Sequence, residues 1–112
     1  ALKHFLTRNG YHICGLADSY EKAVPEITIL KPDLVITDIM LSTSKTGIDL
    51  ARYINRRLQI PFIFQSSVND DAIIASALLT NPVSYLPKPV NRSDLLNAIG
   101  SFFRDSCISC LF

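Results

Sequence analysis

The chain has 112 residues, of which 48% are hydrophobic and 19% are charged. This size and balance fit one compact domain and exclude a disordered chain. Its 11 basic and 10 acidic side chains give a formal net charge of +1, so the composition shows no excess of basic residues for binding nucleic acid. No stretch approaches the roughly 20 apolar residues of a membrane-spanning helix. We therefore expect neither direct nucleic-acid contact nor membrane contact by this chain.

The cysteines indicate a reducing compartment. Their number, three, is odd for a disulfide framework, and disulfides are rare in cytoplasmic proteins. Cys107 and Cys110 form a C-x-x-C in the tail, but neither a second pair nor a nearby histidine completes a zinc site. We expect a cytoplasmic protein whose tail cysteines have no special role.

Helix-period and strand-like segments alternate along the chain, which predicts a parallel sheet covered by helices. The first helix carries Leu2, Phe5 and Leu6 on one face and stops at Asn9-Gly10. Strands are then expected at 11–17, 34–37, 62–65 and 83–86. A helix follows each strand, beginning near Asp18, Gly47, Asn69 or Asp70, and Asn91.

The apolar positions of these segments predict the core. The strand at 34–37 is apolar without alternation, as expected when both faces are buried. In the last three helices, the spacing of apolar side chains predicts inward positions for Leu50, Ile54, Leu58, Ile73, Ala77, Leu78, Leu95, Ile99 and Phe102.

Three expected strands end, in chain order, with Asp38, Ser66 and Lys88. Ligands of open parallel sheets bind beyond the carboxyl ends of the strands, so these side chains should converge. A carboxylate can act as a nucleophile toward phosphorus, while a hydroxyl and an ammonium can hold the oxygens of a transferring phosphoryl group. Each residue alone is better explained as a turn residue, a loop hydroxyl or a surface lysine. The three together predict phosphoryl transfer.

The surrounding segments resemble the CheY-like receiver domain of two-component response regulators. The similar segments are PDLVITDIML (32–41), GIDLA (47–51), IPFIFQSS (60–67) and YLPKP (85–89). The resemblance extends to about Phe103. It implies a flavodoxin-like α/β fold, a doubly wound parallel sheet of order 2-1-3-4-5, and a cis peptide bond between Lys88 and Pro89.

The resemblance also implies a role for each site residue. Asp38 would be the phosphoacceptor, receiving a phosphoryl group from a histidine kinase or phosphotransfer protein. Ser66 and Lys88 would bind this group, and Tyr85 would be an aromatic switch that turns inward as Ser66 moves. Asp38 and the backbone carbonyl of Met40 would be ligands of Mg²⁺. The chain would be no metabolic enzyme, because its chemistry would be limited to its own phosphorylation and dephosphorylation.

One family feature is missing from the chain. Receiver domains begin with a strand that ends in two acidic residues, which bind Mg²⁺, whereas this chain begins at the first helix. Magnesium requires near-octahedral oxygen coordination, so we expect its binding to be weak or absent with only Asp38 and a carbonyl left. Asp18, Asp70 and Asp71 are candidate substitutes, but helix capping explains each of them better.

The missing strand is the central one in the family order, and three explanations stay open. The first, which we favour, is that residues 1–112 are a single receiver domain truncated at its N-terminus, with 104–112 a tail of uncertain structure. The second is that another copy supplies the strand, which would make a homodimer. The third is that the tail at 107–112 fills the slot through a right-handed crossover, without supplying carboxylates.

Two other functions are compatible with the sequence. The missing acidic pair is consistent with a receiver-like module that dimerises or binds a protein partner independently of phosphorylation. A flavodoxin-like domain for a nucleotide or flavin would share the fold, but the chain has no G-x-G-x-x-G loop. Arg56 and Arg57 are the only two adjacent basic residues in the sequence. A solvated helix face explains them better than a phosphate contact does.

Overall fold

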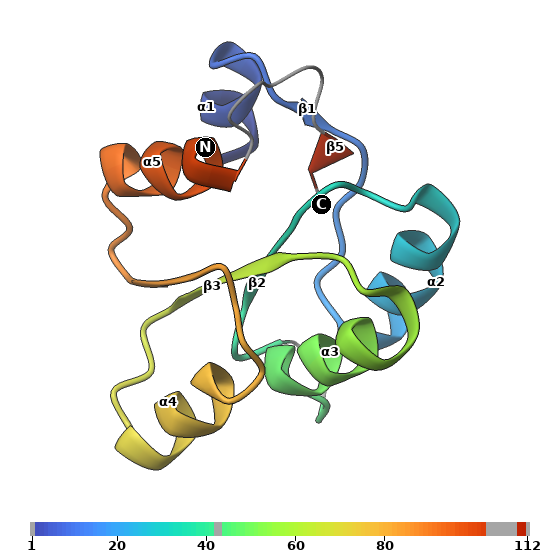
Figure 1. Cartoon of the computed structure of the whole chain (residues 1–112), viewed down its shortest axis with the longest axis vertical. Coiled ribbons are helices and arrows are strands. Elements are labelled where there is room, and N and C mark those ends of the chain that lie inside the picture. The colour runs from blue at the N-terminus through green and yellow to red at the C-terminus, as the bar shows by residue number, and fades with distance from the viewer. Residues whose placement is uncertain (1, 42–43, 103–109, 112) are drawn as a thin grey trace.

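The fold is known from a computed structural model that describes residues 2–41, 44–102 and 110–111, with side chains described at 4–41 and 44–100. Helices and strands alternate along the described chain (Figure 1). In chain order they are α1 (Leu2–Arg8), β1 (His12–Ile13), α2 (Tyr20–Leu30), β2 (Val35–Asp38), α3 (Gly47–Tyr53), η1 (Ile54–Leu58), β3 (Phe62–Ser66), α4 (Asp71–Leu78), β4 (Ser84–Pro87), α5 (Arg92–Phe102) and β5 (Cys110–Leu111).

All described strand pairs are parallel. Strands β2, β3 and β4 form a sheet with β3 in the middle, in which Asp38 is opposite Gln65 and Ser66 is opposite Pro87. Strand β1 pairs with β5, with His12 opposite Cys110. The alternation of parallel strands and helices confirms the predicted α/β class.

Local signals set several helix ends. Gly10 has a φ of 91° and follows α1 in a turn, a backbone conformation that glycine adopts without steric cost. The N-cap of α5 is Asn91, whose side chain accepts hydrogen bonds from the backbone N–H groups of Ser93 and Asp94. The stop of the first helix and the Asn91 cap are as predicted.

The start of α2 differs from the prediction. Its N-cap is Ser19, whose side chain accepts a hydrogen bond from the backbone N–H of Lys22 at 3.2 Å. Because the helix begins at Tyr20, Asp18 lies one residue too early to cap it and pairs instead with the Lys22 ammonium at 3.5 Å. The helix continues through Pro25 to Leu30.

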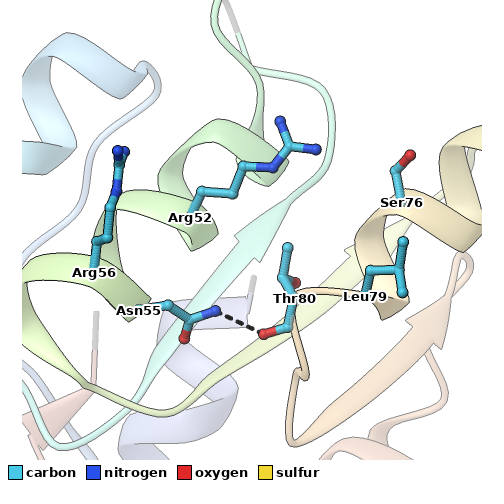
Figure 2. Close-up of a pocket in the computed structure, with 6 residues that line it drawn as sticks. All are labelled: Arg52, Asn55, Arg56, Ser76, Leu79 and Thr80. Atoms are coloured by element: carbon cyan, nitrogen blue, oxygen red, sulfur yellow. Dashed lines mark hydrogen bonds between the residues drawn. The ribbon is translucent and has the colours of Figure 1, made fainter.

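The helix expected after Gly47 changes type before it ends. Residues 54–58 form the π-helix η1, which closes with a hydrogen bond of 2.6 Å from the N–H of Gln59 to the carbonyl of Ile54. The Asn55 side-chain amide donates to the carbonyl of Thr80, 2.8 Å away and 25 residues later in the chain (Figure 2). This bond ties η1 to the segment that follows α4.

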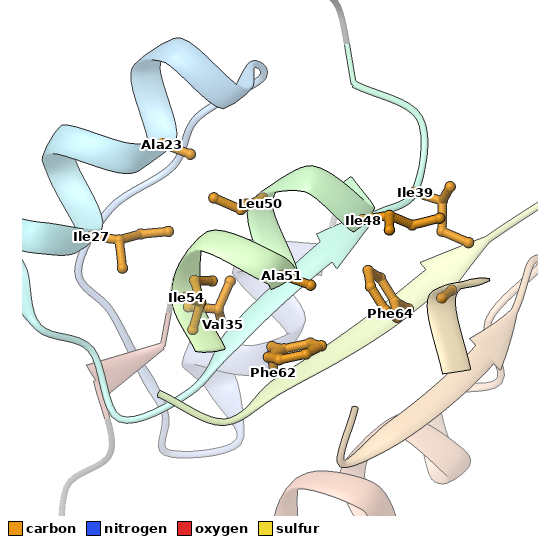
Figure 3. Packing of buried hydrophobic residues seen from close by; sticks show 11 residues of the cluster. Ala23, Ile27, Val35, Ile39, Ile48, Leu50, Ala51, Ile54, Phe62 and Phe64 are labelled. Atoms are coloured by element: carbon orange, nitrogen blue, oxygen red, sulfur yellow. The ribbon is translucent and has the colours of Figure 1, made fainter. Parts of the chain in front are cut away.

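Buried side chains pack on both sides of the sheet. One cluster joins β2 and β3 to α2, α3, η1 and α4, with Phe62 and Phe64 on the strand side (Figure 3). The other joins the sheet to α1 and α5, and it contains Leu34, Ile63 and Leu95. Successive residues of a strand point to opposite faces, so an uninterrupted apolar strand supplies both cores. This is the doubly wound arrangement that the sequence predicted.

Two of the predicted core positions lie at the C-terminal ends of α4 and α5. Leu78 is exposed although an inward position was expected, whereas its neighbour Ala77 is fully buried. Consecutive helix residues are about 100° apart around the axis, and in α4 the sheet face is centred on Ala77, which leaves Leu78 toward solvent. The prediction for Leu78 is therefore wrong. Phe102 lies in α5, but its side chain is outside the described residues.

The edge at β1 is the least predictable part of the fold. The strand expected at 11–17 is wrong in length, since only His12 and Ile13 pair, and they pair with the two residues of β5. The three explanations for the missing strand stay open: β5 lies beside β1, but among the described residues it pairs with no strand of the β2–β3–β4 sheet. Cys14 is disulfide-bonded, which the odd cysteine count did not predict, since a count cannot say which thiols the fold brings together. Cys107 lies outside the described residues.

No described helix is both long and apolar enough to span a membrane.

Candidate functional site

The carboxyl ends of β2, β3 and β4 form one edge of the parallel sheet. Asp38 is the last residue of β2, Ser66 is the last residue of β3, and Lys88 directly follows β4. The backbone N–H of Lys88 donates to the carbonyl of Ser66 at 2.7 Å. The Lys88–Pro89 peptide bond is cis, as the resemblance implied. The structure therefore brings the three predicted residues to one place from positions far apart in the chain.

Asp38 and Lys88 form an ion pair at this edge. The Lys88 Nζ lies 2.6 Å from Asp38 Oδ1, and the side chains are 41% and 37% exposed. Oδ1 itself is shielded from solvent, and no hydrogen bond besides this ionic contact reaches it within the described chain. A partly exposed pair is screened and contributes little to stability. Its significance is that it fixes a positive charge beside the carboxylate.

The Ser66 hydroxyl lies in a turn at the end of β3. Ser66 is buried, and its Oγ accepts a hydrogen bond from the backbone N–H of Val68 at 2.9 Å. This contact stabilises the turn that follows the strand. The hydroxyl is therefore held at the edge of the sheet by the turn.

Tyr85 occupies an inward position on β4. It packs against the cluster that contains Phe64, and the two rings are 6.3 Å apart at an angle of 58°. The Tyr85 hydroxyl is buried and has no hydrogen-bond partner in the described part of the chain. A buried hydroxyl without a hydrogen-bond partner is unfavourable. A different position of the Tyr85 side chain could give this hydroxyl a partner.

The loop after Asp38 returns onto the same strand end at Gly47. The N–H of Gly47 donates to the carbonyl of Ile39 at 2.6 Å, and a Cβ at Gly47 would overlap the carbonyl oxygen of Asp38. Thr46 and Asp49 form a capping box there, since each side chain accepts from the other's backbone N–H. From the sequence, Gly47 was expected to start a helix and to belong to the segment 47–51 that resembles receiver domains. The signal for the closed loop was Thr46 with Asp49 three residues later.

The acidic side chains are the candidate ligands for a metal ion at this edge. Among the described residues, no three His, Cys, Asp or Glu side chains gather into a group that could hold a metal ion. Asp70 caps α4 by accepting from the N–H groups of Ala72 and Ile73, and Asp71 lies in the first turn of that helix. Asp38 and the carbonyl of Met40 are thus the donors predicted at this edge, fewer than the six oxygens that Mg²⁺ takes.

The sequence as a whole matches a known family. Residues 1–100 match the response regulator receiver domain family. The chain belongs to the response regulator receiver family. Receivers have a flavodoxin-like α/β fold, which agrees with the parallel sheet and its two helical layers.

Individual receivers show the same relationship. The transcriptional regulatory protein PdtaR of Mycobacterium tuberculosis is 33% identical over 98 residues, which cover 88% of this chain and 47% of PdtaR. The chemotaxis protein CheY of Thermotoga maritima is 28% identical over 99 residues, or 88% of this chain and 82% of CheY. The receiver chain therefore spans about half the length of PdtaR and most of CheY.

Solved receivers superpose well on the structure. The signal receiver domain of a modulated diguanylate cyclase from Desulfovibrio desulfuricans G20, described as an example of alternate folding, has a TM-score of 0.84 and 32% identity. This match covers 93% of this receiver and 82% of that chain. A two-component response regulator from Clostridium difficile has a TM-score of 0.83 and 31% identity, covering 92% and 84%.

Proposed function

We propose that this receiver takes a phosphoryl group on Asp38 from a histidine kinase or phosphotransfer protein and thereby switches a protein-interaction surface. The observation that carries the proposal is the Lys88 ammonium 2.6 Å from the Asp38 carboxylate, at the edge where Ser66 also ends its strand. Such a site offers a nucleophile together with positive charge for the oxygens of the transferring group. Membership of the receiver family supports the same role.

The proposed reaction moves one phosphoryl group from nitrogen to oxygen. A carboxylate oxygen of Asp38 forms the new bond to phosphorus as the bond between phosphorus and the donor histidine breaks. The electron pair of the broken bond goes to the imidazole nitrogen, which then takes up a proton. Lys88 neutralises the charge on the phosphoryl oxygens, since catalysis of this kind consists largely of positioning and electrostatic stabilisation. Hydrolysis of the acyl phosphate restores the carboxylate and releases phosphate.

The proposed switch uses Ser66 and Tyr85. A phosphorylated site carries roughly −1.5 to −2 charges at neutral pH for ordinary phosphoesters, and an acyl phosphate should act similarly. This charge would draw the Ser66 hydroxyl from its bond with the Val68 N–H toward the phosphoryl group. Tyr85, whose ring is partly buried beside Phe64, would be the aromatic switch that turns further inward as Ser66 moves. The surface formed by α4, β4 and α5 would report the change.

Receiver domains generally bind Mg²⁺ at the phosphorylation site. In this chain Asp38 and the carbonyl of Met40 would hold it, and the metal would help neutralise the phosphoryl oxygens. Because no three His, Cys, Asp or Glu side chains gather into a metal-binding group among the described residues, we propose that magnesium binding by the 112 residues is weak. No step above depends on it.

We further propose a cytoplasmic location and that residues 1–112 belong to a single receiver domain. The partners would be proteins, with a homodimer as one form and without direct nucleic-acid or membrane contact by this domain. Turnover of a metabolite is not part of the proposal.

Phosphorylation can be measured directly by intact mass after incubation with acetyl phosphate and Mg²⁺. We expect the mass of one phosphoryl group to be added to the wild-type chain and none to Asp38→Asn. Asp33→Asn is the matched control, because Asp33 is exposed and precedes β2, at the opposite end of that strand from Asp38, and it should label as wild type does. Labelling of Asp38→Asn equal to wild type would contradict the assignment of the phosphoacceptor.

A second candidate function is a receiver-like module that dimerises or binds a protein independently of phosphorylation. It is favoured by the lack of a group of three His, Cys, Asp or Glu side chains that could hold a metal ion among the described residues. The same variant separates the two functions. Unlabelled protein whose partner binding is unchanged by Asp38→Asn would favour the second, whereas labelling confined to Asp38 would favour the first. The labelling should be repeated on a chain that includes a first strand with its acidic pair, because weak magnesium binding alone could prevent it.

A further inference from the structure

A cavity of about 410 Å³ lies between the helix formed by α3 and η1 and the end of α4. It is lined by Arg52, Asn55, Arg56, Ser76, Leu79 and Thr80 (Figure 2). None of these residues belongs to the strand ends that carry Asp38, Ser66 and Lys88. The volume falls within the range of 300–1,000 Å³ that is typical of small-molecule sites.

Hydrogen bonds fix one wall of this cavity. The Asn55 amide donates to the Thr80 carbonyl at 2.8 Å, and the buried Thr80 hydroxyl donates to the carbonyl of Ala77 at 2.5 Å. These bonds connect η1 with the chain that leaves α4. The two sides of the cavity are therefore held at a set spacing before any ligand binds, which lowers the entropic cost of binding.

Two arginines provide positive charge. Arg52 and Arg56 are four residues apart, so they rise from the same helix face, as Figure 2 shows. The Arg52 guanidinium is 3.9 Å from the Asp49 carboxylate, whereas Arg56 has no ion pair among the described residues. Among the described residues, no acidic side chain lines the cavity. Guanidinium groups bind phosphate oxygens in a bidentate geometry, so the charge suits a phosphate.

The π-helix is a second, independent feature of this wall. Asn55 and Arg56 both belong to η1, which ends with the bond from the Gln59 N–H to the Ile54 carbonyl. π-Helical turns are rare in proteins, and those that do occur are often found at functional sites. Here the π-helix carries two of the six residues that line the cavity.

The opposite side offers apolar and hydroxyl groups. Leu79 is 80% exposed, and Ser76 lies beside it in the lining from α4. An exposed leucine across the cavity from two arginines suits a ligand that combines a phosphate with an apolar or planar part. We propose that this cavity binds a small phosphate-bearing ligand, with its phosphate on Arg52 and Arg56 and its apolar part on Leu79. This non-covalent site goes beyond the proposed phosphorylation of Asp38 and does not depend on it.

The site can be tested by titrating the isotope-labelled chain with pyrophosphate and with ADP, while backbone amide resonances are followed by NMR. We expect saturable shifts at the cavity residues with both probes, and tighter binding of ADP because only ADP has a planar part for Leu79. Arg56→Gln should weaken binding by about tenfold or more, the loss expected for one hydrogen-bonded charge. Asp38→Asn should bind as wild type does, which separates this site from the phosphoacceptor.

Arg57→Gln is the matched control, because it removes the same charge from the neighbouring position of η1, which does not line the cavity. It should change binding by less than about twofold, since an exposed charge that makes no direct contact with the ligand is largely screened by solvent and salt. Equal weakening by Arg57→Gln and Arg56→Gln would overturn the proposal, because it would indicate non-specific attraction. Failure of both probes to give saturable shifts at millimolar concentration would also overturn it. Unchanged circular dichroism of each variant verifies folding.

Discussion

At the scale of single residues, Gly47 connects the phosphoacceptor strand with the loop that follows it. Its N–H donates to the Ile39 carbonyl, and the space where a Cβ would lie is filled by the Asp38 carbonyl. The close approach is between two backbones, so it cannot be relieved by rotating a side chain. The position of Asp38 therefore depends on the absence of a side chain at a residue nine positions later.

Replacing Gly47 by alanine should lower the free energy of unfolding by about 1–3 kcal/mol, the usual cost of overpacking. It should also slow labelling by acetyl phosphate, because the carbonyl of Asp38 has to move. Urea unfolding measures the first effect and intact mass the second. Gly100→Ala is the control: its Cβ would meet nothing within 4 Å, and alanine should stabilise α5 by roughly 0.5–1 kcal/mol. Equal stability of Gly47→Ala and wild type would show that the loop adapts.

At the scale of elements, the helices are held to the sheet by one face each. In α2, Ile27 is 0% exposed and belongs to the cluster with Phe62 and Phe64, whereas Ile29 is 79% exposed. Both residues are isoleucines in the same helix, so the difference between them that matters for stability is their burial. Stability should follow the burial and not the helix propensity that they share.

Ile27→Ala should lower the free energy of unfolding by about 2–5 kcal/mol, because it removes buried methyl groups and leaves a cavity. Ile29→Ala should change it by less than about 0.5 kcal/mol, since exposed substitutions rarely matter more. Thermal or urea unfolding of the two variants side by side gives the comparison. Similar losses at both positions would mean that α2 packs differently from the arrangement in Figure 3.

At the scale of the whole molecule, the two cores meet at β3. This strand lies between β2 and β4, and its residues enter both buried clusters, Phe62 and Phe64 on one side and Ile63 on the other. The β1–β5 pair has two residues in each strand and pairs with no other described strand. Local unfolding should therefore begin at β1 and β5, and β3 should be the last strand to unfold.

Amide hydrogen exchange should show this order. We expect the N–H groups of β3 to be among the slowest to exchange, close to global unfolding, and those of His12 and Ile13 to exchange at least about tenfold faster. The exchange can be measured residue by residue with NMR. Protection of β1 equal to that of β3 would contradict the expectation and would place β1 within the cooperative sheet.

The sequence by itself determined the order of helices and strands, the two-sided burial of the sheet and the convergence of Asp38, Ser66 and Lys88. These features follow from short-range patterns, because apolar spacing and caps act within a few turns of chain. They also follow from a general rule of parallel sheets, whose carboxyl strand ends share one edge. That rule makes a site from distant residues predictable without coordinates.

Only the tertiary structure decided the pairing of β1 with β5, the outward position of Leu78, and the cavity where Asn55 binds the chain after α4. It also decided the disulfide at Cys14. The physical reason is that each depends on which surfaces pack together across long stretches of chain. Apolar periodicity states that a face is buried, but it does not state which partner covers that face.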